Sequence, residues 1–183
     1  MKFSRLLTLL IFLIPAASRQ AAAQGRNEIG FSLGGGSLQT NPGAGATAVF
    51  SLSYQFHITR HFSAEGALDL FNYKFLTGPP DSPYIYKDDY LGAEAAAVYY
   101  FRASRQTGRL LPFIAAGIGK TTTDFTEIAA HPYYRLGAGV AYHLSDRLGF
   151  RLEARDEIIR SLSIHGSPNG NLPSIRFGIF LSF

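Results

Sequence analysis

The chain has no cysteine among its 183 residues, so it offers neither a disulfide framework nor a thiolate site. It also has little surplus charge once its first residues are set aside. The formal charge is +4, but Lys2, Arg5 and Arg19 all lie in the leader, and removing these three cations leaves +1. Nucleic-acid binding needs a basic face, which such a chain lacks, so we expect no nucleic-acid partner.

Long apolar runs are missing beyond the N-terminal region. The leader combines Lys2 and Arg5 with an apolar run over residues 6–14 and small residues at 21–23, a pattern typical of secretory signal peptides. Its run is shorter than the roughly 20 residues that a membrane helix needs. We therefore predict a signal peptide over residues 1–23 and one domain over residues 24–183. A membrane-spanning form of this domain has to use strands.

Residues 147–157 show the strongest pattern in the sequence. Leu148, Phe150, Leu152 and Ala154 alternate with glycine or charged residues, as in a β-strand with two different faces. A soluble sheet buries the apolar face, whereas a transmembrane barrel turns that face to lipid and its charges to the lumen. The small, lysine-poor polar faces of the other segments suit a narrow lumen and favour the barrel.

Eight alternating segments occur in the sequence, each close to the 9–11 residues of a tilted membrane strand. Leu70 and Phe71 interrupt the alternation of the third segment, which suggests a β-bulge. Longer connections are expected over residues 39–45, 74–88, 121–131 and 158–172, and Gly78-Pro79-Pro80 argues against a strand in the second of these. The predicted strands cover residues 28–36, 46–58, 61–73, 90–101, 110–120, 133–144, 147–157 and 174–183.

Long and short connections alternate along the chain, so all long ones fall at one end of the predicted barrel. Bacterial outer-membrane barrels have short periplasmic turns and longer outer loops, and an even strand number places both termini on the periplasmic side. Aromatic residues of the apolar face cluster at that same end, as in an interfacial girdle. They are Phe56, Phe62, Tyr99, Phe101, Tyr142 and Phe183, whereas Tyr134 is the best candidate for the opposite girdle.

The alternating strands, the strand end Tyr99-Tyr100-Phe101 and the closing residues 178–183 together resemble the small eight-stranded outer-membrane barrels. That group includes the transmembrane part of outer membrane protein A. The resemblance implies an all-β, eight-stranded antiparallel up-and-down barrel in the outer membrane, in contact with lipids and lipopolysaccharide. It also implies that the barrel-assembly machinery reads Phe183 as a terminal aromatic signal. The fold does not specify an activity, because such barrels serve many functions.

Charged residues on the predicted lumen parity balance one another. The acids are Glu65, Asp69, Glu94 and Glu153, and the bases are Arg135, Arg151, Arg155 and Arg176. An eight-stranded barrel is barely wide enough for its own side chains, and arginine suits bidentate pairing with carboxylates. We therefore expect a salt-bridged plug, with an ion gate, a proton relay or a narrow porin-like channel as the alternatives.

An enzymatic alternative rests on His165 and Ser167. Lipid A 3-O-deacylases, which are also eight-stranded barrels, carry a His-x-Ser-Asn motif near the last strand and a later glutamate. Here Pro168 replaces the asparagine, and no acid follows Glu157. A histidine without an orienting acid lacks the third member of a triad, so we predict a non-enzymatic barrel with a structural or loop-mediated interaction role.

No cofactor or metal site is predicted, because the five histidines lack metal-ligand spacing. His57 and His143 are expected to point into the lumen and to hydrogen-bond there. Asp81, Asp88 and Asp89 share one predicted loop, where calcium is conceivable but a solvated loop is favoured. The barrel is expected to be a monomer.

Overall fold

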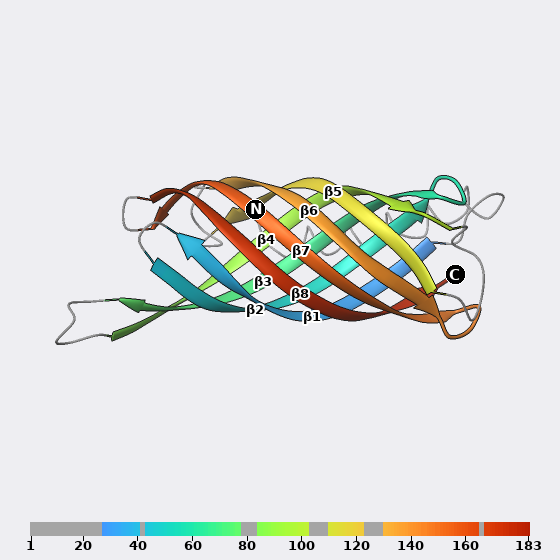
Figure 1. The fold of residues 1–183 in the computed structure, drawn as a ribbon, viewed down its shortest axis with the longest axis horizontal. Coiled ribbons are helices and arrows are strands. Elements are labelled where there is room, and N and C mark those ends of the chain that lie inside the picture. The colour runs from blue at the N-terminus through green and yellow to red at the C-terminus, as the bar shows by residue number, and fades with distance from the viewer. Residues whose placement is uncertain (1–26, 41–42, 78–83, 103–109, 123–129, 165–166) are drawn as a thin grey trace, which may run out of the picture.

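The computed structural model describes residues 27–40, 43–77, 84–102, 110–122, 130–164 and 167–183. These residues form eight strands and no helix (Figure 1). Helices that are long and apolar enough to cross a membrane are absent from the described residues. The strands are β1 (Asn27–Thr40), β2 (Gly43–His57), β3 (Phe62–Thr77), β4 (Tyr84–Tyr100), β5 (Leu110–Thr122), β6 (Ala130–His143), β7 (Leu148–Ile164) and β8 (Ser167–Ser182).

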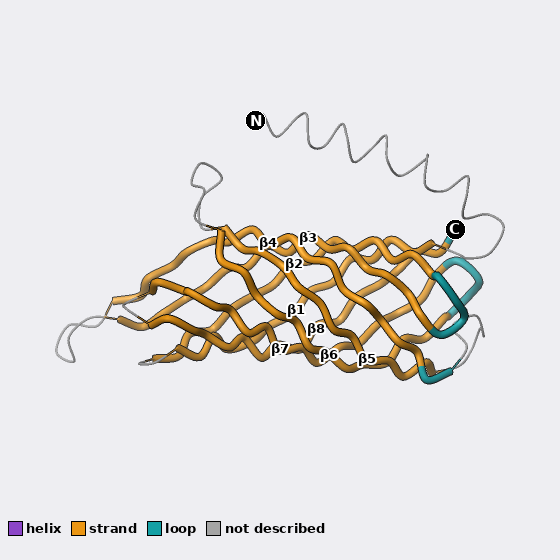
Figure 2. The backbone as a smooth tube through the Cα atoms, turned by 90° about the horizontal axis from the view of Figure 1, so that it is seen from above, coloured by secondary structure: helices purple, strands orange, loops and turns teal. Residues whose placement is uncertain are grey.

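Each strand pairs antiparallel with its neighbours in sequence, and β1 also pairs with β8, which closes the barrel. The tube in Figure 2 shows the strands crossing obliquely around one elongated wall. At one end, the backbone amide of Asn27 donates to the carbonyl of Phe183 at 3.0 Å, and Phe183 returns a bond of 2.9 Å. We call this the terminal end and the opposite one the far end. The predicted antiparallel eight-stranded barrel is therefore confirmed.

Alternation along each strand separates two environments. On β8, Ile175, Phe177 and Ile179 are exposed, whereas Ser174 and Arg176 between them are buried. Successive side chains of a strand point to opposite faces, so the alternating sequence places apolar groups outside and polar groups inside. The aromatic side chains predicted to form a girdle also point outward at the terminal end, with Phe101 57% and Phe183 50% exposed.

The predicted bulge at Leu70 and Phe71 is wrong. The register of β3 runs without interruption from Phe62 to Thr77 against β4, and Phe71 simply points inward. Its aromatic ring packs inside the barrel. In the sequence, an apolar residue at an inward position, where a polar one is expected, resembles a break in the alternation. The irregularity that does occur lies in β7, between Arg160 and Ile164.

Three of the expected long connections are largely strand. The first is residues 39–45, where β1 and β2 stay paired as far as Thr40 and Gly43. β3 and β4 stay paired as far as Thr77 and Tyr84, and β7 and β8 as far as Ile164 and Ser167. Strands of 13 to 17 residues exceed the roughly 9–11 that a bilayer needs, so paired hairpins extend the far end. The β3–β4 hairpin projects farthest in Figure 1. Gly78-Pro79-Pro80 argues against a strand only where it stands, and the apolar and aromatic residues on either side of it extend β3 and β4.

The interior has three layers. At the terminal end, a terminal cluster joins apolar residues of β4, β5, β6 and β8: Val98, Tyr100, Leu111, Phe113, Ala115, Ala141 and Phe180. At the far end, a far cluster joins Val49, Phe71, Tyr73, Tyr90, Tyr133, Ile159 and Leu172. Charged side chains of β3, β4 and β6 to β8 fill the space between them.

Glycine makes room for the rings of both clusters. A Cβ atom at Gly119 would lie 2.6 Å from the hydroxyl oxygen of Tyr133, and one at Gly149 would lie 2.7 Å from a ring carbon of Phe180. Real Cβ atoms do not approach so closely, so each ring occupies the volume that a side chain on the neighbouring strand would need.

Candidate functional site: the charged layer of the lumen

Strand β7 contributes four charged residues to this layer. Arg151, Glu153, Arg155 and Glu157 alternate in sign on its inward face, because residues two apart in a strand point to the same side. Glu153, Arg155 and Glu157 are buried, and Arg151 is half-buried. One strand therefore presents two bases and two acids in a row to the strands across the lumen.

Arg135 of β6 is the centre of the layer and is completely buried. Its Nη1 donates to Glu65 Oε1 at 2.7 Å and also to Glu94, and its Nη2 donates to Glu153 Oε1 at 2.7 Å. These three carboxylates come from β3, β4 and β7. A single guanidinium thus connects four strands through charge-assisted hydrogen bonds.

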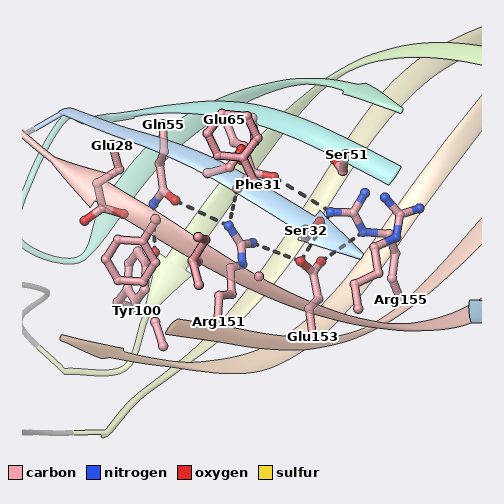
Figure 3. A pocket seen from close by; sticks show the side chains of 17 residues that line it. Glu28, Phe31, Ser32, Ser51, Gln55, Glu65, Tyr100, Arg151, Glu153 and Arg155 are labelled. Carbon is pink, nitrogen blue, oxygen red and sulfur yellow. Dashed lines mark hydrogen bonds and ion pairs between the residues drawn. The ribbon is translucent and has the colours of Figure 1, made fainter. Parts of the chain in front are cut away.

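Arg151 lies on the terminal side of Arg135 and reaches the same acids. It donates to Glu65, and its Nη2 lies 3.1 Å from Glu153 Oε2. Figure 3 shows its guanidinium between Gln55 and Glu65 on one side and Glu153 on the other. The same group lies 4.3 Å from the ring centre of Phe113, so it also covers the terminal cluster.

Arg155 and Arg176 complete the far side of the layer. Arg155 Nη1 lies 3.0 Å from Glu94 Oε1 and 3.4 Å from Asp69 Oδ2. Arg176 Nη1 donates to Asp69 Oδ2 at 2.9 Å, and its Nη2 donates to Glu157. All eight residues predicted for the lumen are therefore brought together inside the barrel.

Neutral side chains hold the carboxylates in place. Tyr133 of the far cluster donates its hydroxyl to Glu94 Oε2 at 3.1 Å, and Ser51 donates to Asp69. Gln55 donates to the hydroxyl of Tyr100 at 2.8 Å, which links the charged layer to the terminal cluster.

Glu157 belongs to the layer, although the predicted set omitted it. Its parity on β7 matches that of Arg151, Glu153 and Arg155, so strict alternation was a sufficient signal. Including Glu157, the layer contains five carboxylates and four guanidinium groups among the described residues. The one surplus negative charge lies near Arg176, because this single guanidinium contacts both Asp69 and Glu157.

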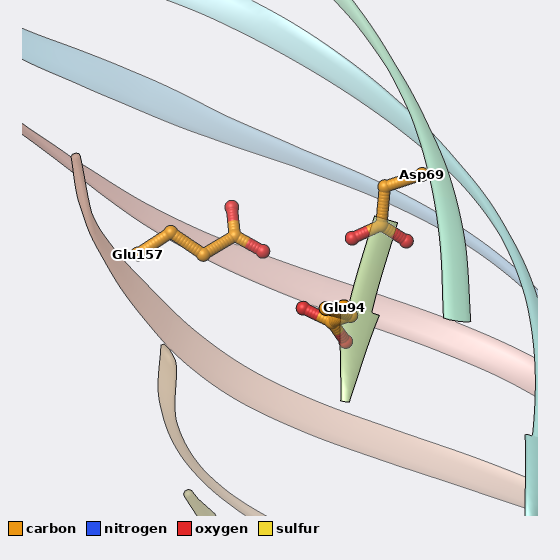
Figure 4. A group of neighbouring side chains, drawn as sticks. All are labelled: Asp69, Glu94 and Glu157. Carbon is orange, nitrogen blue, oxygen red and sulfur yellow. The ribbon is translucent and has the colours of Figure 1, made fainter. Parts of the chain in front are cut away.

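Three carboxylates of the layer converge as a metal site would require. Oxygens of Asp69, Glu94 and Glu157 lie within 4.8 Å of one another (Figure 4). Arg155 Nη1 lies within 3.5 Å of one oxygen of each carboxylate. A guanidinium already supplies the positive charge at the centre of this group, so the geometry fits ion pairing.

A second polar group lies at the terminal end, as expected for His57 and His143. His57 Nε2 is 3.1 Å from Glu28 Oε1, and its Nδ1 is 2.8 Å from the Ser63 hydroxyl. His143 Nε2 lies 3.9 Å from the same Glu28 oxygen. Serine, histidine and glutamate thus form a chain with the order of a hydrolase triad, but Ser63 has no exposed surface. A nucleophile needs access to its substrate.

A small cavity lies in the described part of the lumen. A cavity of about 30 Å³ lies along the inward faces of β1, β2 and β8, bordered by Arg151, Glu153 and several serines and glycines (Figure 3). That volume accommodates about two water molecules.

Two predicted features lie away from this layer. His165 is outside the described residues, and Ser167 begins β8. Phe183 is exposed at the terminal end, where its backbone closes the β1–β8 seam through the two bonds with Asn27.

Known structures reproduce this architecture. Neisserial surface protein A superposes with a TM-score of 0.64 at 14% identity, covering 86% of this chain and 97% of that one. The outer membrane enzyme PagL gives 0.56 at 18% identity, covering 81% and 97%. Ail of Yersinia pestis, solved with the heparin analogue sucrose octasulfate, gives 0.51 at 14% identity, covering 87% and 99%. At these identities the likeness establishes the fold alone.

Sequence comparison identifies the family. No curated protein sequence matches the chain significantly. The model of the outer membrane protein beta-barrel domain, in contrast, matches residues 6–180, nearly the whole chain. The exposed apolar face therefore meets lipid, and the inward face forms the lumen, as in other barrels of this kind. The chain belongs to the outer membrane protein beta-barrel domain family and is a transmembrane protein of the outer membrane.

Proposed function

We propose that the protein is a non-enzymatic outer-membrane barrel with a closed lumen, which acts as a rigid support for its far-end hairpins. The observation that carries this proposal is the charged layer, in which four arginines join the strands across the full width of the lumen. A rigid support of this kind suits a structural or interaction role, because binding surfaces are commonly built on loops held by a rigid scaffold.

A conducting lumen is the first alternative, and two features argue against it. The terminal and far clusters place apolar side chains on both sides of the charged layer. The lumen cavity has room for about two water molecules, much less than a water-filled pore needs. Ions would have to break buried pairs and displace packed rings to cross.

A lipid-modifying enzyme is the second alternative, favoured by the structural likeness to the enzyme PagL. That likeness concerns the fold, which hosts many functions. Pro168 stands where the His-x-Ser-Asn motif of the deacylases has asparagine, and Ser63 of the terminal group is completely buried. These observations favour a barrel without hydrolytic activity.

The proposed partners follow from the location. Lipid and lipopolysaccharide would contact the apolar outer face, and the barrel-assembly machinery would read Phe183 during insertion. The proposed state is a monomer. In this arrangement the termini face the periplasm and the β3–β4 and β7–β8 hairpins face outward.

Conductance of the refolded protein in planar lipid bilayers tests the closed lumen. We expect no stable openings in the unmodified barrel. Arg135→Ala should admit water and raise leak currents, whereas Arg147→Ala in an exposed turn should not. Large, stable openings of the unmodified protein would overturn the proposal and favour transport.

A further inference from the structure

Three side chains with metal-binding atoms meet at the terminal end of the lumen. Glu28 is the second residue of β1, His57 is the last residue of β2, and His143 is the last residue of β6. The Nε2 atoms of the two histidines lie 3.1 Å and 3.9 Å from the same oxygen, Oε1 of Glu28. All three residues are buried, but they lie at the mouth of the barrel, where 11% of the His143 side chain and 7% of the Glu28 side chain remain exposed.

Glu28 differs from the other buried acids of the lumen in its partners. Arginine contacts each of the five acids of the charged layer: Glu65, Asp69, Glu94, Glu153 and Glu157. Within the described residues, the ion-pair partners of Glu28 are the two histidines, and Ser182 adds a hydroxyl donor at 3.4 Å. Histidine, unlike arginine, does not carry a permanent charge near pH 7. A buried carboxylate without a permanent cation is unfavourable, so this position suits a bound cation.

Neighbouring side chains orient both histidines. His57 Nδ1 lies 2.8 Å from the hydroxyl oxygen of Ser63, which is completely buried. Metal-bound histidines usually donate their other ring N–H to an oxygen, which fixes the ring and leaves the lone pair on the ligating nitrogen. With Nδ1–H donating to Ser63, Nε2 of His57 presents its lone pair towards Glu28. His143 packs edge-on against Phe180, with the ring centres 4.9 Å apart.

Two imidazoles and one carboxylate suit a late first-row metal ion such as zinc, whereas calcium and magnesium prefer oxygen ligands. Two atoms bound to one tetrahedral zinc ion are about 3.4 Å apart, because Zn–N and Zn–O distances are near 2.1 Å. The separations of 3.1 Å and 3.9 Å lie on either side of this value. The imidazoles approach Glu28 from opposite walls, because β2 and β6 face each other in the closed strand order. An ion would draw both rings towards Glu28.

We propose that Glu28, His57 and His143 bind a divalent transition metal ion of the zinc type from the periplasm. The ion supplies a positive charge beside Glu28 and joins β1, β2 and β6 at the terminal end of the barrel. The inference uses the periplasmic position of this end. It depends neither on the closed lumen nor on the absence of enzymatic activity, so its failure would leave the proposed function intact.

Calorimetric titration of the refolded, tag-free barrel with zinc chloride tests the site. We expect one zinc ion per barrel and a higher thermal midpoint of unfolding, because a ligand that binds only the folded state stabilises it. Calcium chloride should produce neither effect. Glu28→Gln, His57→Gln and His143→Gln should each weaken zinc binding about tenfold or more. His61→Gln is the matched control, because His61 lies at the same end but packs on the outward-facing Tyr99.

Cobalt(II) reports the ligand geometry, since its visible absorption bands are intense in a tetrahedral site and should disappear when zinc displaces it. Ser63→Ala should weaken zinc binding about tenfold and leave the form of the cobalt spectrum unchanged, because it removes only the group that orients His57. An unchanged affinity would overturn this positioning role.

Heat-modifiable migration on gels checks folding of every variant, and His143→Gln decides the matter if Glu28→Gln does not fold. No zinc binding by the unmodified barrel would mean that protonated histidine alone partners Glu28, and it would overturn the proposal. Zinc affinity that survives His143→Gln, or an equal loss in His61→Gln, would also overturn it.

Discussion

The two faces of the barrel wall belong to the same strands, but they place different requirements on their side chains. On β7, Leu152 faces lipid among interchangeable apolar neighbours, whereas Glu153 beside it contacts Arg135, Arg151 and Arg155. Outside, a residue needs only to be apolar, because lipid adapts to its shape. Inside, each side chain has to match the position and charge of its partners. A buried charge that loses its partner is costly, because no bulk water is there to solvate it.

The lumen face is therefore the more specific of the two. Its buried charges make it costly to damage, since a carboxylate deprived of its partner stays inside the barrel. The outer face is more tolerant but excludes one class of residue, the charged ones, within the apolar band. Substitutions on each face can measure this difference.

The largest expected effect is at the centre of the lumen. Arg135→Met removes the guanidinium that contacts Glu65, Glu94 and Glu153, and it should lower the free energy of unfolding by about 3–5 kcal/mol. Urea-induced unfolding in lipid vesicles measures the change. Arg147→Met, in an exposed turn, is the control and should cost less than about 0.5 kcal/mol. Similar losses in both variants would show that the charged layer is dispensable.

A charge on the outer face should have the next largest effect. Leu152→Arg places a cation on lipid and should cost about 2–4 kcal/mol if the site lies near the midplane. Leu144→Arg makes the same substitution at an exposed position in the β6–β7 turn, where the charge stays in water or headgroups. The yield of folded barrel in vesicles should fall only for Leu152→Arg. Equal yields would argue against the assigned lipid-facing band.

Two glutamates of one strand should respond unequally. Glu153→Gln breaks pairs with three arginines, whereas Glu157→Gln removes an acid that shares Arg155 and Arg176 with Asp69. Removing the local surplus of negative charge offsets part of the lost pairing, so Glu157→Gln should be less destabilising by about 2 kcal/mol. Parallel urea titrations of the two variants give the difference. A larger loss for Glu157→Gln would mean that its charge is needed.

No effect is expected at the two residues of the enzymatic alternative. His165→Ala and Ser167→Ala should leave folding unchanged, because the charged layer that joins the strands is built from other residues. Mass spectrometry of lipid A from expressing cells should show the same acyl chains with and without the protein. Loss of an acyl chain that Ser167→Ala abolishes would contradict the non-enzymatic role.

Sequence reasoning reached the strand number, the antiparallel topology and the faces of most strands, since each depends on local alternation. It also selected eight members of the charged layer from parity alone. It failed where alternation was masked or absent. Phe71 suggested a bulge because an inward aromatic residue broke the pattern. Gly78-Pro79-Pro80 argued against a strand throughout residues 74–88, although the chain on either side of it extends β3 and β4.

Two features depended on tertiary structure. Which arginine contacts which acid follows from the stagger of strands far apart in sequence, as for Arg176 and Asp69, 107 residues apart. The apolar clusters on either side of the charged layer likewise arise from side chains of several strands. The amino-acid sequence by itself determined which way each side chain of a strand points, because that period is local. Only closure of the barrel decided which side chains meet, because a contact across the lumen depends on the register of every strand between them.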